Sequence, residues 1–229
     1  MTPFPTFYEI IIILEDSKMT RSENVTQVLD ILQRDYPDAR VTLDFHNPLE
    51  LLIATILAAQ CTDERVNRVT PALFRKHKTA EDFARAGAKT LEEDIRPTGF
   101  YHNKAKNIIA ACQVIGQRFH GQVPRILDEL TSLPGVGRKT ANIILGNAYG
   151  QQAIAVDTHV KRVTHRLGWA KAEDPDKIEF ELMKVIPQER WTMACHQIVF
   201  HGRIICPAKN PQCPICRVAA LCPQVGVAP

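Results

Sequence analysis

The sequence has no hydrophobic run long enough to cross a membrane. The aliphatic run in FYEIIIILED (residues 7–16) holds five residues between Glu9 and Glu15, whereas a membrane-spanning helix needs about 20. No basic segment and no small-residue cleavage site accompany this run, so it is not typical of a secretion signal. These absences predict a cytoplasmic protein without a membrane anchor.

A strong excess of one charge is also missing. Lysine and arginine number 28 against 25 aspartate and glutamate residues, which gives a formal net charge of +3. This surplus is compatible with a polyanionic partner but does not identify one. The hydrophobic content of 45% excludes global disorder.

Helical periodicity dominates the chain and predicts an all-α fold of about ten short helices. Helices are expected over residues 47–59, 63–75, 102–119, 125–132, 138–148, 158–167, 176–186 and 188–205. In the first of them, Asn47 is the predicted N-cap, Pro48 takes the first helical position and Glu50 follows the cap by three residues. Only the IIIIL run is typical of a strand. It falls in residues 1–18, which are either an N-terminal extension or the product of an upstream start codon before Met19.

The segment SLPGVGRKTANIIL (residues 132–145) is expected to form a turn followed by an apolar helix. Gly135 and Gly137 allow positive φ and leave the amides around Val136 uncovered by side chains. Such amides at a helix N-terminus can bind a phosphate, and Arg138 can strengthen the contact. Glycine turns with basic residues also join helices without any ligand, and this spacing is not that of a nucleotide P-loop.

Lys139 lies away from the apolar stripe of the helix predicted at 138–148. The positive end of that helix and the neighbouring Arg138 are both expected to lower the lysine pKa. A lysine that is partly neutral can attack a carbon and form a Schiff base. A solvated surface lysine is the alternative.

Asp157 ends the apolar stretch 153–156 and stands just before the predicted helix 158–167. An aspartate in this place is most simply an N-cap. It also stays ionised, so it can accept a proton or stabilise a developing sugar cation. His159 and Arg162 belong to the basic face of the helix, which suits phosphates or is merely solvated.

The seven cysteines are distributed unevenly. Three are scattered through apolar helices and are expected to be inert core residues. The other four have the spacing C-x6-C-x2-C-x5-C: Cys206, Cys213, Cys216 and Cys222. Four thiols so close together predict a metal centre in a reduced compartment. Four-cysteine zinc sites usually have two C-x2-C pairs and this segment has one, so both zinc and a [4Fe–4S] cluster stay open.

The segments LPGVGRKTAN and VDTHVKRV, the second with its aspartate 18 residues after the lysine of the first, resemble the endonuclease III family of DNA glycosylases/AP lyases. The resemblance extends from about residue 20 to Cys222 and includes LLIATILAAQCTD, GFYHNKAKNI and the terminal cysteines. It implies that Lys139 attacks C1′ of the damaged nucleotide and that Asp157 assists departure of the base. Elimination from the lysine imine would then cut the strand 3′ to the abasic sugar. The resemblance further implies a [4Fe–4S] cluster on the four cysteines.

The resemblance also implies the parts that extrude a nucleotide from the stack. Gln60 matches a glutamine that fills the vacated space, Phe100 takes a wedge position where leucine is common, and His159 matches a pocket-side histidine. Ala58 and Cys61 stand where relatives often carry serine and alanine, which leaves the range of accepted lesions open.

Two domains follow from the same resemblance: a six-helix domain over 41–151 and a cluster domain made of 19–40 plus 152–229. The expected partner is double-stranded DNA with oxidised pyrimidines or abasic sites, bound by a monomer at the nucleoid. One alternative is a monofunctional mismatch glycosylase, a group that typically lacks the lysine and carries an extra C-terminal domain. Another is a non-catalytic or redox-sensing DNA-binding module.

Overall fold

The protein is described by a computed structural model over residues 20–227, and no strand occurs in that part of the chain. The predicted all-α class is confirmed, while the IIIIL run lies outside the described residues. The elements, in order, are α2 (Arg21–Asp35), α3 (Pro48–Leu57), α4 (Asp63–Lys76), α5 (Ala80–Ala84), α6 (Ala88–Ile95), η1 (Arg96–Thr98), α7 (Tyr101–Arg118), α8 (Leu127–Thr131), α9 (Arg138–Ala148), α10 (Thr158–Arg166), α11 (Pro175–Met183), η2 (Gln188–Arg190), α12 (Trp191–Ile204), η3 (Cys213–Ile215) and η4 (Ala219–Leu221). None of these helices is long and apolar enough to span a bilayer.

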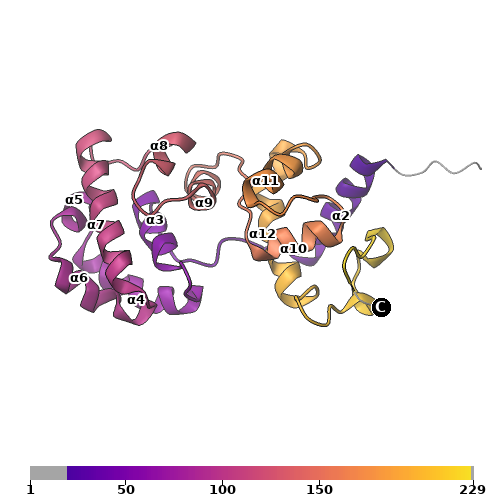
Figure 1. The fold of residues 1–229 in the computed structure, drawn as a ribbon, viewed down its shortest axis with the longest axis horizontal. Coiled ribbons are helices and arrows are strands. Elements are labelled where there is room, and N and C mark those ends of the chain that lie inside the picture. The colour runs from indigo at the N-terminus through magenta and orange to yellow at the C-terminus, as the bar shows by residue number, and fades with distance from the viewer. Residues whose placement is uncertain (1–19, 228–229) are drawn as a thin grey trace, which may run out of the picture.

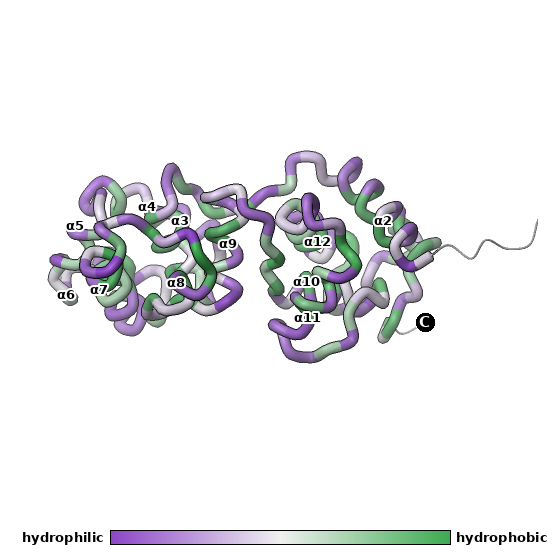
Figure 2. The backbone as a smooth tube through the Cα atoms, turned by 90° about the horizontal axis from the view of Figure 1, so that it is seen from above, coloured by the Kyte–Doolittle hydropathy of each residue, from purple (hydrophilic) through white to green (hydrophobic). Residues whose placement is uncertain are grey.

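The helices enclose two separate hydrophobic cores. One is built from α3 to α9, and the other from α2 together with α10, α11 and α12. Figure 1 shows these two groups side by side, with the indigo α2 lying among the orange C-terminal helices. Figure 2 shows the same two groups from above. The chain therefore passes between the cores twice, at residues 36–47 and 149–157.

Helix α3 occupies the centre of the first core because it is apolar almost all round. Leu51, Leu52 and Ile53 are fully buried. The predicted cap is confirmed, since Asn47 accepts from the Glu50 amide at 3.0 Å and proline takes the first turn. The Glu50 carboxylate departs from a capping box, because it accepts from the amide of His46 instead.

Several predicted boundaries shift in the structure. The helix expected over 188–205 is divided into η2 and α12, and the one expected over 125–132 is shortened to α8. The helices α2, α5 and α6 were absent from the predicted set. By contrast, the range predicted for the helix that carries Lys139 is that of α9.

Candidate active site

A groove lies between the two cores and receives side chains from both. Its volume is about 480 Å³, within the roughly 300–1,000 Å³ of typical ligand sites. Lys139 from the first core and Asp157 from the second line this one groove. The structure therefore brings together the two side chains that the sequence predicted to share a site.

Lys139 is exposed on the first turn of α9, directly after the glycine turn. Gly137 is the N-cap and supplies no side-chain hydrogen bond, so the first amides of the helix have no capping group. Gly135 has φ of +77°, and a Cβ there would meet Asn107 at 2.8 Å. Gly137, however, has φ of −89°. The prediction that both glycines use positive φ is thus wrong for Gly137, whose missing side chain leaves the amides open instead.

Asp157 is the N-cap of α10, as its simplest interpretation predicted. Its Oδ1 accepts from the Val160 amide at 2.8 Å. The other carboxylate oxygen has no hydrogen-bond partner within residues 20–227. Capping by one oxygen therefore leaves the second available for chemistry in the groove.

A buried polar network links the helix of Lys139 to the segment that precedes Asp157. Arg138 donates from Nε and Nη2 to the two oxygens of Glu179, at 2.7 and 2.8 Å. The Asn142 amide nitrogen donates to Glu179 at 2.9 Å and to the carbonyl of Ile154 at 2.8 Å. These contacts fasten α9, α11 and residues 154–157 together, so they fix how Lys139 and Asp157 face one another.

Sequence reasoning missed Glu179 and Asn142. The available signal was that Glu179 lies on the apolar face of α11, between Ile178 and Leu182, which are fully buried. A carboxylate on such a face needs a charged or hydrogen-bonded partner. That partner is Arg138, whose pKa the Glu179 hydrogen bonds raise. The contact of Arg138 with a DNA phosphate stays a prediction.

His159 also lines the groove, on the first turn of α10. Burial lowers its pKa, against the opposing effect of Asp157 and together with Arg162 and Arg203. Arg162 Nη2 lies 3.1 Å from His159 Nδ1. Because arginine can only donate, Nδ1 accepts and the neutral ring carries its proton on Nε2.

The Arg162 guanidinium contacts residues of α10 and of the segment at the end of α12. Besides His159, it donates to the carbonyls of Gly202 at 2.9 Å and Cys206 at 3.2 Å. This arrangement ties α10 to the end of α12 and favours a structural role. The phosphate contact predicted for Arg162 is not tested by it.

Gln60 and Phe100 both stand in loops of the first core and both adopt left-handed backbone conformations. Their φ angles are 53° and 49°, in the left-handed region that residues other than glycine rarely adopt. Gln60 lines the groove, and Phe100 is 64% exposed. Strained, exposed residues of this kind are common at functional sites.

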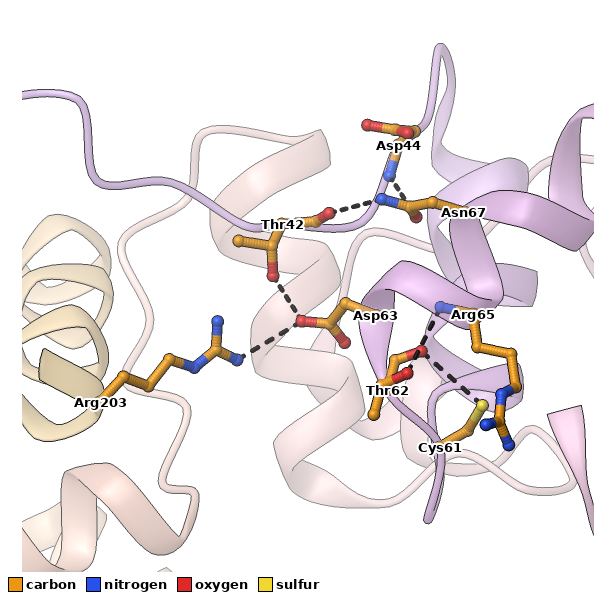
Figure 3. Close-up of polar contacts among 8 residues, drawn as sticks. All are labelled: Thr42, Asp44, Cys61, Thr62, Asp63, Arg65, Asn67 and Arg203. Carbon is orange, nitrogen blue, oxygen red and sulfur yellow. Dashed lines mark hydrogen bonds and ion pairs between the residues drawn. The ribbon is translucent and has the colours of Figure 1, made fainter. Parts of the chain in front are cut away.

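An ion pair between Arg203 and Asp63 crosses between the cores. Figure 3 shows Arg203, from α12, pointing toward Asp63 at the start of α4, with Thr42 hydrogen-bonded to the same carboxylate. Asn67 holds the adjoining linker by donating to the Thr42 carbonyl at 2.8 Å and accepting from the Asp44 amide at 3.0 Å. The linker 36–47 is therefore attached to the first core beside the groove.

The four C-terminal cysteines line one pocket beside the second core. Cys206 follows α12, Cys213 and Cys216 lie at the two ends of η3, and Cys222 follows η4. Arg166 donates to Cys206 Sγ at 3.1 Å, and the Gln224 amide donates to Cys222 Sγ at 3.4 Å. Hydrogen bonds from amides and a guanidinium are the surroundings that thiolate ligands require.

Within residues 20–227, no group of three or more His, Cys, Asp or Glu side chains is arranged to hold one ion, although zinc would need four sulfurs about 2.3 Å from one point. Burial, with the neighbouring cysteines, raises the pKa of Cys216 and Cys222. Without a positively charged group beside them, the thiols of Cys216 and Cys222 therefore favour the protonated form.

Comparisons with known proteins show which family the chain belongs to. Residues 53–188 match the model described as HhH-GPD superfamily base excision DNA repair protein. The chain is 50% identical over 206 residues to Endonuclease III of Synechocystis sp., covering 90% of this chain and 94% of that protein. It is 44% identical over 205 residues to Endonuclease III of Bacillus subtilis, covering 89% and 94%.

A solved structure agrees over nearly the whole chain. The structure of a trapped endonuclease III–DNA covalent intermediate, an estranged-adenine complex, has a TM-score of 0.84 at 46% identity. The match covers 90% of this chain and 97% of that one.

Proposed function

The chain belongs to the HhH-GPD superfamily and, within it, to the endonuclease III family, and from this membership we propose how its residues carry out base excision repair. It is a DNA glycosylase and AP lyase that acts on double-stranded DNA with damaged bases. We assign the nucleophile to Lys139 and the carboxylate partner to Asp157. The single observation that carries this assignment is that both side chains line one groove, at the N-termini of α9 and α10.

In this mechanism the Lys139 nitrogen attacks C1′ of an extruded nucleotide, and the base departs with the electron pair of its glycosidic bond. Asp157 caps α10 through one oxygen, and its other oxygen can stabilise the positive charge that develops on the sugar and accept a proton from the lysine. Ring opening then gives a Schiff base between the lysine nitrogen and C1′. Loss of a C2′ proton expels the 3′ phosphate, and water releases the lysine.

The glycine turn is proposed to hold a DNA phosphate at the start of α9. The amides there have no side-chain cap, and a helix N-terminus attracts anions. A contact of this kind positions the duplex without reading its sequence. Gly135, Val136 and Gly137 shape the binding turn, and Arg138 supports it from its place on Glu179.

The side chains that replace the extruded nucleotide are proposed to be Gln60 and Phe100. Both are exposed on loops of the first core, and the aromatic ring can stack between bases. Oxidised pyrimidines are the proposed lesions, with His159 beside the extruded base. The two cores are proposed to be the two domains expected from the sequence, and a substrate of duplex DNA would place the enzyme at the nucleoid.

The four C-terminal cysteines are proposed to hold a [4Fe–4S] cluster. Such a cluster is held by four cysteine thiolates, and the sulfurs here share a pocket with Arg166 and a backbone amide as hydrogen-bond donors. The cluster would brace the C-terminal segment against α10 and α12. No step at Lys139 passes through it.

The assignment of Lys139 is tested by borohydride trapping on duplex DNA with one abasic site. Wild type should give a covalent adduct, and Lys139→Arg should give none while keeping the charge that binds DNA. Lys89→Ala is the matched control, because Lys89 is an exposed lysine on α6. A trapped adduct in Lys139→Arg would overturn the assignment. A panel of duplexes, each with one damaged base, then ranks the lesions by base release and by nicking.

A further inference from the structure

Lys104 is the one lysine that is buried among the described residues, with 4% of its surface exposed. It lies on the first turn of α7, three residues after the helix begins at Tyr101. Its ammonium donates to the carbonyl oxygens of Leu57 and Thr98, both at 2.8 Å. Burial lowers the Lys104 pKa, with Cys61 acting in the opposite direction. Burying an ammonium is unfavourable unless it is well hydrogen-bonded. The cost of burying Lys104 is therefore offset by its bonds to the Leu57 and Thr98 carbonyls.

The two carbonyls lie at the bases of the two loops that enter the DNA in the proposed function. Leu57 is the last residue of α3, and Gln60 follows it by three positions. Thr98 is the last residue of η1, and Phe100 follows it by two. Both loops then turn through positive φ, at 53° for Gln60 and at 49° for Phe100.

Each loop has a reason to need an external support. Helix α3 ends without a basic residue in its last turn, so its free carbonyls and negative dipole end are stabilised by a cation from elsewhere. Left-handed backbone at a non-glycine residue is also unfavourable by itself. A lysine ammonium suits this place because it is compact and carries three donors on a long stem.

Resting on the proposed function, we infer that Lys104 is a positioning residue for nucleotide extrusion, which holds the Gln60 and Phe100 loops at a fixed spacing by bonding the carbonyls of Leu57 and Thr98. The two loops come from distant parts of the chain, and the single ammonium contacts both. Without the Lys104 ammonium, Gln60 and Phe100 stay on their loops, but the distance between the two loops is no longer fixed. Gln60 and Phe100 then no longer enter the base stack of the duplex together.

This role predicts a loss that depends on the substrate. Extruding a nucleotide from a duplex requires unstacking and unpairing, whereas a single strand is already unpaired. Chemistry at Lys139 is the same on both. A purely structural lysine would change both substrates equally, so their ratio separates the two roles.

The experiment compares Lys104→Met with wild type by borohydride trapping on one abasic oligonucleotide, as a single strand and in a duplex. Methionine has a similar length and neither charge nor donors. We expect the trapping rate on the duplex to fall by between about ten-fold and 100-fold, as for a misplacement of ~1 Å, and the rate on the single strand to stay within about two-fold. The matched control is Gln197→Leu, which removes a buried polar group in the other core and should leave the ratio unchanged.

A double-mutant cycle adds an independent readout. If Lys104 acts through the wedge, Lys104→Met combined with Phe100→Ala should be little slower on the duplex than Phe100→Ala alone. Fluorescence of 2-aminopurine opposite the abasic site should report weaker unstacking in Lys104→Met. If that variant does not fold, Lys104→Arg, which keeps the charge but changes the donor geometry, is tested on the same two substrates.

The outcomes are distinguishable. Equal rate losses on duplex and single strand, or fully additive effects in the cycle, would overturn the inference for Lys104. Failure of the proposed function would show earlier, because wild type would then give no adduct on either substrate.

Discussion

Replacing Glu179 by glutamine should loosen the attachment of α9, the helix that carries Lys139, to the second core. The wild-type carboxylate accepts three hydrogen bonds, two from Arg138 and one from Asn142. Glutamine has nearly the same shape, but it loses the charge and presents an NH₂ group toward donors. The buried ion pair is thereby broken with Arg138 left in place.

The expected magnitude follows from burial. Removing one partner of a fully buried pair destabilises a protein by about 3–5 kcal/mol. Only 8% of the Glu179 side chain is exposed, but 27% of the Arg138 side chain is, so water can partly replace the lost partner. We therefore expect the free energy of unfolding to fall by about 2–3 kcal/mol.

Urea unfolding followed by circular dichroism and tryptophan fluorescence measures this change. Glu64→Gln is the matched control, since Glu64 forms an exposed pair with Arg68 on one helix and its loss should change the free energy by less than about 0.5 kcal/mol. Relative to wild type, Glu179→Gln should also show a larger fold-loss in the rate of borohydride trapping on abasic duplex DNA than in its affinity for that DNA. The reasoning about the network is refuted if Glu179→Gln unfolds at the same urea concentration as Glu64→Gln.

Three further predictions use other parts of the structure. Gly135→Ala should destabilise the protein by about 1–2 kcal/mol because of its positive φ, while Gly137→Ala should keep the melting temperature and weaken DNA binding; thermal melts and filter binding check the pair. Burial lowers the pKa of His196, so the unfolded chain takes up a proton near pH 6.5 before the folded chain does. Stability should then be lost as the pH falls below about 6.5, and His196→Gln should flatten this slope in urea titrations at several pH values. Cys213→Ser should remove bound iron and the broad visible absorbance, whereas Cys112→Ser, in the first core, should retain both by iron analysis.

The sequence predicted those helices whose apolar periodicity and end-capping residues indicate the same start and end. The range 138–148 and the Asn47 cap are correct because glycine, proline and a capping side chain mark those ends locally. Helix α5 was missed although Thr79 and Asp82 form a capping box there. It spans five residues, too few for a periodic pattern to be visible.

The residues of the site also differ in how far the sequence could predict them. Lys139 and Asp157 drew notice because each stands at a glycine-marked or cap-marked helix start, but their expected roles came from the resemblance to the endonuclease III family. The apolar pattern of α11 could mark Glu179 as a buried carboxylate in need of a partner, but it could not name Arg138, which lies 41 residues away and meets Glu179 only through the packing of the two cores. The same holds for Lys104, whose carbonyl partner Leu57 is 47 residues away.

The central claim is that a single lysine side chain bonds covalently to the sugar. Wild-type enzyme is reacted with a duplex that carries one abasic site, reduced with borohydride and digested with a protease, and the peptide that carries the sugar remnant is sequenced by mass spectrometry. The added mass should lie on Lys139. A remnant on any other residue, such as Lys104 or Lys161, would contradict the account.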